Sequence, residues 1–382
     1  MPPSTSPPTV LWLHNYAAPY GTRPVAMIKA LDRRCRELGY RFECGYPSDA
    51  RGRPWVTWLE DVGIPVSYAP DGRRARAEWL AGRLDELPGP AILHAHFAGF
   101  DLAAVAACRR REQAAAVWHM HSFLRRDPVY VARSVLKFAL ARRRVARIVC
   151  VGESLAEAVR RRGAPKDRTV VVENGIEVDR FELTTPEQRR TARESLGIAE
   201  SAPVLLHFGR DWAIKGGALY TESLARLRAR GVPAVGLVVG ASDEYRAAAS
   251  RSDLAGSIVL ADPSEDVRRF YDASDLFVAT SRAEGAPMAI VEALSCGVAV
   301  VATDIPGHRL DGAGLPLRLT PEQPERVAEL AEHLLGESAP EQRARAERAH
   351  GWVLRERSLP RWVELMSNVY TAVFAELDRG RG

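Results

Sequence analysis

Residues 280–303 read TSRAEGAPMAIVEALSCGVAVVAT, and this stretch predicts a polar loop, a helix that stops at Gly297 and a buried strand. Pro287 suits the first position of the helix, where its missing N–H costs nothing. Gly285 allows the backbone to approach a ligand closely. The Gly285-Ala286-Pro287 turn would therefore direct free N–H groups and the positive end of the helix dipole at an anion.

Two carboxylates accompany this helix start. Glu284 lies just before the helix, and Glu292 faces the same end about a turn and a half further on. An acid pair beside a helix start that favours anions indicates a ligand that is part phosphate and part polyol. We expect the C-terminal half of the chain to be built around such a ligand.

The composition bounds the class of protein. A chain of 382 residues suits two domains of about 150 to 200 residues each. Its five cysteines are scattered, odd in number and without metal-ligand spacing, which favours reduced thiols in a cytoplasm. The first eight residues, MPPSTSPP, lack the features of a signal peptide and predict a disordered lead-in. Because no apolar run is long enough to cross a bilayer, we expect a cytoplasmic protein that is soluble or at most peripheral at the inner membrane face.

The charge is divided unequally between the halves. Residues 1–180 hold 29 Lys/Arg against 19 Asp/Glu, whereas residues 181–382 hold 24 against 29. A basic first half can serve an anionic acceptor, a phosphorylated ligand or the inner face of an anionic membrane, and solvated faces of arginine-rich helices are the alternative that we favour. The basic helix expected near residues 129–144 has the same two readings. Nucleic-acid binding is not expected, since no recognition motif or aromatic platform accompanies the charge.

Strands and helices alternate through the first half. The expected strands are apolar on both faces, which indicates a parallel sheet covered by helices. Residues 46–63 read as loop, and the polar stretch 184–193 reads as a linker. The predicted organisation is a lead-in at 1–8, a first Rossmann-like domain at 9–180, a second at 181–355 and a C-terminal helix at 356–382.

Four of the nine histidines fall at the carboxyl ends of expected strands, where ligands bind in sheets of this kind. They are His14, His96, His119 and His121. For any single one, a polar cap on the sheet edge is the alternative reading. A zinc site is not expected, because no Cys or carboxylate accompanies them at ligand spacing. We expect His121 to line a ligand cleft, although the two-residue strand period barely separates it from His119.

The second half opens with an apolar strand at 203–208 that runs into Gly209, where the chain can leave the strand sharply. Arg210 offers a planar fork of donors to phosphate oxygens. Lys215 is the only lysine in the second half, and its point charge could lie against a second phosphate. Such cations would neutralise charge that builds up on a leaving group. The alternative is an ordinary surface loop.

Taken together, these segments resemble a retaining glycosyltransferase of the GT-B fold, and most closely glycosyltransferase family 4. Most of residues 90–310 take part in the resemblance. The matching pieces are Gly209-Arg210-x4-Lys215-Gly216, Ser281-Arg282-x-Glu284-Gly285-x-Pro287-x4-Glu292-Ala293, Cys296-Gly297-Val298-Ala299-Val300-Val301-Ala302-Thr303-Asp304, Val149-Cys150-Val151-Gly152-Glu153-Ser154 and Val172-Glu173-Asn174-Gly175-Ile176.

The resemblance implies an α/β fold of two facing Rossmann-like domains, with the last helix crossing back to the first. It implies that Arg210 and Lys215, after Gly209, hold the donor diphosphate and that Glu292 takes the ribose hydroxyls. The remaining implied roles concern the sugar, and they fall on Glu284, Gly285, Ala286, Pro287 and, from the first domain, His121.

Two positions depart from the family pattern. Relatives often carry a Gly-Gly pair in the first loop, where this chain has only Gly21. Relatives also often carry an aromatic residue after Glu-Gly, where this chain has Ala286.

The implied reaction is transfer of a hexose with retained anomeric configuration from a nucleotide diphosphate sugar, UDP before GDP. The implied acceptor is a hydroxyl of an envelope glycan, a lipid or a secondary metabolite. No cofactor and no metal are expected. A sugar-nucleotide epimerase on the same fold and a non-catalytic sugar-nucleotide-binding protein are the alternatives.

Overall fold

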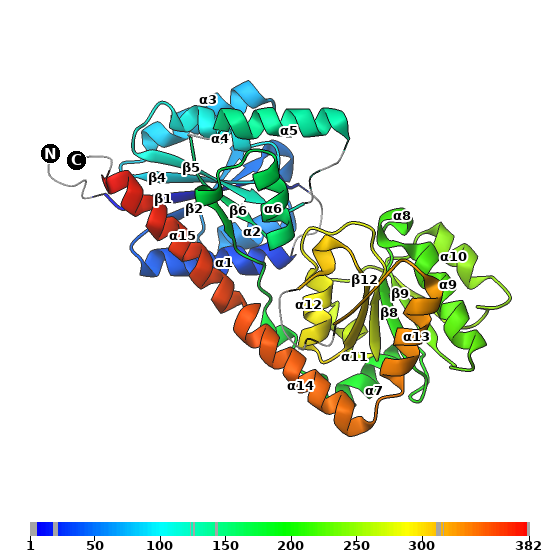
Figure 1. The fold of residues 1–382 in the computed structure, drawn as a ribbon. Coiled ribbons are helices and arrows are strands. Elements are labelled where there is room, and N and C mark those ends of the chain that lie inside the picture. The colour runs from blue at the N-terminus through cyan, green and yellow to red at the C-terminus, as the bar shows by residue number, and fades with distance from the viewer. Residues whose placement is uncertain are drawn as a thin grey trace. The chain divides into compact units, whose positions relative to one another are not determined.

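The computed structural model describes residues 6–17, 22–122, 124, 127–141, 144–310, 315 and 317–379. The chain forms two compact units, which are described separately (Figure 1). The first unit comprises Met1–Asn174 with Leu359–Gly382, and the second comprises Gly175–Ser358. Gly21 and residues 1–5 of the expected lead-in lie outside the described residues.

The first unit is built on a seven-stranded sheet in the order β3-β2-β1-β4-β5-β6-β7. All of its strand pairs are parallel. The strands are β1 (Thr9–His14), β2 (Arg41–Pro47), β3 (Val66–Ala69), β4 (Ala91–His96), β5 (Ala114–Met120), β6 (Val145–Cys150) and β7 (Thr169–Val171). Strands β1 and β4 are buried along their whole length, as the apolar runs predict for a sheet covered on both faces.

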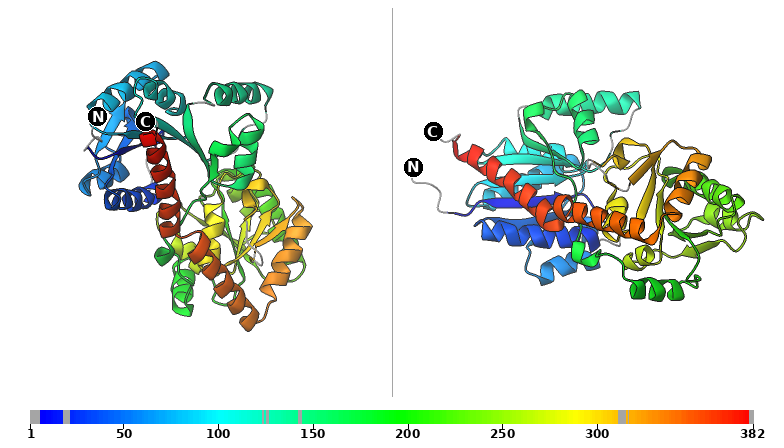
Figure 2. Two further views of the ribbon diagram at one scale, coloured as in Figure 1. Left: turned by 60° about the vertical axis from the view of Figure 1, so that its left-hand side comes forward. Right: turned by 60° about the horizontal axis from the view of Figure 1, so that its bottom comes forward.

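Helices surround this sheet, and the last helix of the chain is one of them (Figure 2). The helices are α1 (Thr22–Glu37), α2 (Pro54–Asp61), α3 (Arg73–Glu86), α4 (Asp101–Cys108), α5 (Pro128–Ala141), α6 (Glu153–Arg161) and α15 (Leu359–Arg379). Trp362, Met366, Tyr370 and Phe374 recur every four residues on α15, so they share one face. That face joins the core formed with β1 and α1. The predicted return of the last helix to the first domain is confirmed.

The second unit holds a six-stranded sheet in the order β10-β9-β8-β11-β12-β13, again with parallel pairs only. Its strands are β8 (Val204–Phe208), β9 (Val235–Val239), β10 (Ile258–Ala261), β11 (Leu276–Ala279), β12 (Ala299–Thr303) and β13 (Leu317–Thr320). Its helices are α7 (Pro186–Ser195), α8 (Trp212–Lys215), α9 (Gly217–Ala229), α10 (Asp243–Ala249), α11 (Arg268–Asp272), α12 (Met288–Ser295), α13 (Pro324–Leu335) and α14 (Ala339–Glu356). The predicted fold class, two Rossmann-like domains with parallel sheets, is confirmed.

Two stretches expected as loop contain helices. The stretch 46–63 holds α2, which starts with Pro54 and buries Trp55, Val56 and Leu59. The stretch 184–193 overlaps α7, whose start is a capping box between Thr185 and Gln188. The Thr-x-x-Gln spacing before α7 was therefore a usable signal for a helix start.

The borders of the units lie at 174/175 and 358/359, whereas we expected 180/181 and 355/356. The reason is packing, because Ile176, Val178 and Phe181 belong to the core of the second unit. Ile176 also pairs with Ser358.

Helix α5 carries the exposed apolar side chains of Val129 and Leu136. Among the described residues, no helix is both long and apolar enough to cross a bilayer.

Candidate functional site

The order of the strands marks one edge of the second sheet as the place for a ligand. From β8 the chain proceeds to β9 and β10 on one side, and β11 then starts the other side of the sheet. Ligands of open α/β sheets bind at such a switch point, beyond the carboxyl ends of the strands. Lys215 follows β8, and Glu284 follows β11.

Lys215 and Glu284 meet at this switch point. Lys215 Nζ donates a hydrogen bond to Glu284 Oε1 at 2.5 Å, and the two side chains are 30% and 21% exposed. Ser281 Oγ donates to the same carboxylate oxygen at 2.8 Å. The structure thus brings together two residues that were selected separately, one as a cation for phosphate and one as a carboxylate for hydroxyls.

Backbone contacts hold the two loops against each other. Thr280 Oγ1 donates to the carbonyl oxygen of Lys215 at 2.8 Å, and the N–H of Arg282 donates to that of Ile214 at 2.9 Å. Gly216 has φ +68°, and a Cβ there would lie 2.0 Å from the carbonyl oxygen of Thr280. Only glycine fits this approach. These contacts therefore fix the backbone position of Lys215.

The loop after β8 contains a short helix where we expected only a loop. Its middle forms the short helix α8, capped by Asp211, whose Oδ1 accepts from the N–H of Ile214 at 2.9 Å. Arg210 is exposed on this loop. Gly209 has a packing reason of its own, because a Cβ there would lie 2.8 Å from both Tyr245 and Val238.

The start of α12 offers free donors. The helix begins at Met288, one residue later than predicted, and Pro287 is its N-cap residue. Within the described part of the chain, no atom accepts a hydrogen bond from the backbone N–H of Gly285, Ala286 or Ala289. Gly285, Ala286 and Pro287 are half-buried. A helix start with unpaired N–H groups favours a negatively charged ligand.

Glu292 lies deeper than the other site residues. Its side chain is on α12, the residue is 1% exposed, and its Oε2 accepts a hydrogen bond from Tyr271 Oη at 2.7 Å. Burying a carboxylate is costly unless it is hydrogen-bonded. The Tyr271 hydroxyl therefore both stabilises Glu292 and fixes where its carboxylate lies.

A third loop contributes to this edge of the sheet, and sequence reasoning missed it. After β12, the turn Pro306–His308 packs on the backbone of Glu284, and a Cβ on Gly307 would lie 2.2 Å from the Glu284 carbonyl oxygen. His308 is buried, and its Nδ1–H donates to the carbonyl oxygen of Thr303 at 2.9 Å. Burial lowers the pKa of His308, while the nearby Glu284 raises it and Lys215 lowers it. The Pro-Gly turn directly after a predicted strand was the available signal.

The selected histidine of the first unit, His121, follows β5. Its Nε2 lies 2.8 Å from Nδ1 of His96, and its ring stacks on that of His119 with centroids 4.2 Å apart. Burial lowers the pKa of His121 to about 4, so the ring is neutral at pH 7. His14, His96 and His119 are buried at the same edge, together with His94, which sequence reasoning did not select.

Two family profiles match the chain. Glycosyltransferase Family 4 matches residues 25–180, and Glycosyl transferases group 1 matches residues 202–337, so together they span about three quarters of the sequence. A D-inositol 3-phosphate glycosyltransferase of Geodermatophilus obscurus is 36% identical over 162 residues, which are 38% of this chain. The match spans only 35% of that relative. The putative teichuronic acid biosynthesis glycosyltransferase TuaC of Bacillus subtilis is 27% identical over 81% of this chain and 77% of its own.

Solved structures share the fold over almost the whole chain. Anabaena Alr3699/HepE, solved in complex with UDP, has a TM-score of 0.81 at 20% identity and covers 95% of this chain and 100% of its own. WaaG, a glycosyltransferase involved in lipopolysaccharide biosynthesis, has a TM-score of 0.65 at 17% identity over 94% of this chain and 99% of its own. The chain has the GT-B fold, and it belongs to glycosyltransferase family 4.

Proposed function

We propose that this protein is a retaining glycosyltransferase that moves a hexose from a nucleotide diphosphate sugar to a hydroxyl group. UDP is the first choice of nucleotide and GDP the second. Support for UDP comes from structural neighbours that were solved with UDP and with UDP-glucose. The acceptor class is an envelope glycan, a lipid or a secondary metabolite, in keeping with relatives named for lipopolysaccharide core and teichuronic acid biosynthesis.

The observation that carries the proposal is the pair formed by Lys215 and Glu284 at the switch point of the second sheet. When the donor binds, its diphosphate replaces Glu284 as the partner of Lys215. The exchange keeps the ammonium group paired, so it avoids leaving a half-buried charge without a counterion. Arg210 and the free N–H groups at the start of α12 take the remaining phosphate oxygens.

The same exchange assigns a role to the carboxylate. Once Lys215 has turned to the phosphate, Glu284 can accept hydrogen bonds from hydroxyls of the transferred sugar. Gly285, Ala286 and Pro287 shape the space beside that sugar. Glu292, held by Tyr271, accepts from the ribose hydroxyls. Two carboxylates therefore recognise two different polyols, one in the nucleotide and one in the sugar.

The chemistry requires charge stabilisation more than a strong base. The bond between the anomeric carbon and the diphosphate oxygen breaks, and a bond from that carbon to the acceptor oxygen forms on the same face. The acceptor proton passes to the departing diphosphate. Arg210 and Lys215 stabilise the negative charge that builds up on the leaving group. No metal or cofactor takes part in this proposal.

Two residues of the first unit also have roles in the proposal. His121 is assigned to the transferred sugar, where its neutral ring can exchange hydrogen bonds with hydroxyls. Gly21 is assigned to the donor phosphate only by the resemblance, because it lies outside the described residues. A peripheral contact of the basic first half with an anionic membrane completes the set of proposed partners.

The proposal is tested in two steps. Thermal-shift titration with UDP, GDP, ADP and dTDP should single out one nucleotide, with UDP expected to raise the melting temperature most. Incubation with the matching sugar donors and NMR of the anomeric proton then follow the product. A new glycoside with the donor's configuration supports the proposal. An inverted product contradicts retention, and an epimerised donor in the absence of acceptor supports the epimerase instead.

A further inference from the structure

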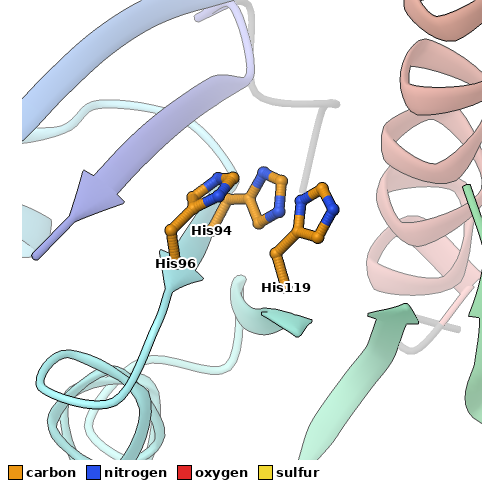
Figure 3. A group of neighbouring side chains, drawn as sticks. All are labelled: His94, His96 and His119. Atoms are coloured by element: carbon orange, nitrogen blue, oxygen red, sulfur yellow. The ribbon is translucent and has the colours of Figure 1, made fainter. Parts of the chain in front are cut away.

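The first unit buries a group of histidines that the proposed function does not use. His94 and His96 lie two residues apart on β4, so both side chains leave the same face of the sheet. His119, on the neighbouring strand β5, pairs in register with His96. The ring centroids are 4.2 Å apart for His94 and His96 and 4.8 Å for His96 and His119. Figure 3 shows the three rings side by side.

Several ring nitrogens of these histidines have no partner in the part of the chain that the structure describes. His94, His96 and His119 are at most 1% exposed. Among the described residues, no hydrogen-bond partner exists for Nε2 of His94, Nε2 of His96 or either ring nitrogen of His119. Buried polar atoms are normally paired, and those that are not call for an explanation such as an ion or a water molecule.

The hydrogen bonds that do exist have the form found around metal sites. His94 Nδ1 lies 2.6 Å from Tyr370 Oη, and His96 Nδ1 lies 2.8 Å from His121 Nε2. If each Nδ1–H donates to its neighbour, each Nε2 presents a lone pair. Histidines that bind metals almost always donate their other ring N–H to such an outer partner.

We propose that His94, His96 and His119 form a binding site for a late first-row transition-metal ion, held by three imidazole nitrogens. One ring nitrogen of each residue lies within 4.8 Å of one on each of the other two. Such atoms lie at most about 2.8 Å from a common centre, against about 2.0–2.1 Å in zinc–histidine complexes. An inward movement of less than an ångström by each ring therefore completes the coordination.

The chemistry of the set limits the choice of ion. Three neutral nitrogen ligands suit zinc and copper, and they do not suit calcium or magnesium, which require oxygen. Trp12 packs against His94 and His96, and in a site so fully buried a smaller charge is easier to bury. Cu⁺ is therefore a candidate beside Zn²⁺. Because the expected ligand spacing included Cys or carboxylate, a set made of histidine alone was passed over in the sequence.

The fluorescence of Trp12 can report on metal binding at the three histidines. The ring of Trp12 lies 3.7 Å from that of His96 and 4.8 Å from that of His94, centroid to centroid. A paramagnetic ion such as Co²⁺, bound at the three histidines, should quench Trp12 fluorescence. The Trp12→Phe variant should bind the same amount of ion and lose that part of the quenching.

The test uses the full chain, expressed once in medium supplemented with Zn²⁺ and once in medium supplemented with copper. Mass spectrometry then measures the metal content of the two preparations. We expect about one ion per chain in at least one arm, and the arms identify the ion. His96→Gln and His119→Phe should each lower the bound metal at least tenfold, and His119→Phe keeps an aromatic ring in the stack. His333→Gln, which removes an exposed histidine of the second unit, should change nothing.

Two results would overturn the proposal. One is wild-type protein that holds no stoichiometric metal from either medium and binds no Zn²⁺, Co²⁺ or Cu⁺ on titration. The other is metal content that stays unchanged in both His96→Gln and His119→Phe, because the ion would then be bound elsewhere. The wild-type measurement decides the matter even if a variant fails to fold.

Discussion

Lys215 Nζ and Glu284 Oε1 are 2.5 Å apart across the carboxyl ends of β8 and β11. Without a ligand, the cation that we assign to the donor diphosphate is thus paired with the carboxylate that we assign to the sugar. The pair keeps both charges compensated until the donor arrives. Donor binding is then a change of partners, and this gives the two residues separable effects on binding and on transfer.

Replacing Glu284 with Gln should lower transfer without lowering nucleotide affinity. The amide keeps the shape of the side chain but no longer pairs with the Lys215 charge, so UDP meets no competitor. We expect the affinity for UDP to be unchanged or tighter, and kcat to fall by about 10²- to 10³-fold, as for loss of one strong transition-state contact. Calorimetry and initial rates measure the two effects. An unchanged kcat would contradict the assignment of Glu284 to the transferred sugar.

Replacing Glu292 with Ala should weaken binding of the free nucleotide. We expect the Kd for UDP to rise at least about tenfold, which corresponds to about 1.4 kcal/mol. The change also removes the carboxylate partner of the buried Tyr271 hydroxyl, which still has the Ala289 carbonyl oxygen 3.3 Å away as an acceptor, so we expect a loss of stability of about 0.5–1.5 kcal/mol. Tyr271→Phe is the matched control, since it removes that hydroxyl and keeps the carboxylate. An unaltered Kd in a folded Glu292→Ala protein would rule out the ribose contact.

Replacing Gly216 with Ala should destabilise the second unit by more than the cost of placing alanine at a positive φ. The new Cβ would lie 2.0 Å from the Thr280 carbonyl oxygen. Gly231 has φ +91°, and a Cβ there would have no described neighbour within 4 Å, so Gly231→Ala is the control for backbone strain, at about 1–2 kcal/mol. We expect Gly216→Ala to cost at least about 3 kcal/mol, in the upper range for single substitutions. Equal costs in chemical denaturation would show that the two loops are not locked together.

The second unit should lose stability in mild acid through His207. Its Nδ1–H donates to the carbonyl oxygen of Val278, so its Nε2 accepts from Tyr245 Oη and the ring is neutral. Burial, with a smaller effect of Lys215, lowers the pKa of His207 from 6.5 to about 4. Between these values only the unfolded chain takes up the proton, so stability falls as the pH drops from 6.5 towards 4.

The contribution of His207 to this pH dependence is about 3 kcal/mol across the whole interval. Denaturant melts of the wild type and of His207→Gln at pH 7.5 and pH 5 measure it. We expect the difference between the two pH values to be smaller in His207→Gln, which cannot take up a proton. An equal difference in both proteins would assign the acid sensitivity to other groups.

Much of the fold could be predicted from the sequence because buried parallel strands are continuous apolar runs between helices. The failures have local causes. Residues 46–63 were expected as loop, although Trp55, Val56 and Leu59 share a buried helix face. The linker 184–193 is so polar that the helix α7 was missed, and only its capping box identifies it.

The site could be predicted less completely than the fold. Motif spacing selected Lys215 and Glu284, but their ion pair joins residues 69 positions apart and depends on how two loops pack. The contact of Gly307 with Glu284 depends on the same packing, which the Pro306-Gly307 turn signal alone does not reveal. His94 was missed because nothing in the sequence shows that its strand lies beside β5 in the register that aligns His96 with His119.

The most direct test of the change of partners compares two ligands in two proteins. Calorimetry measures the affinities of UDP and of uridine for the wild type and for Lys215→Met, with the exposed Lys166→Met as the control for loss of a lysine. We expect Lys215→Met to lower the affinity for UDP at least about tenfold, or about 1.4 kcal/mol. The affinity for uridine should not change, because only UDP carries the diphosphate. Equal affinity of wild type and Lys215→Met for UDP would contradict the assignment of Lys215 to the donor diphosphate.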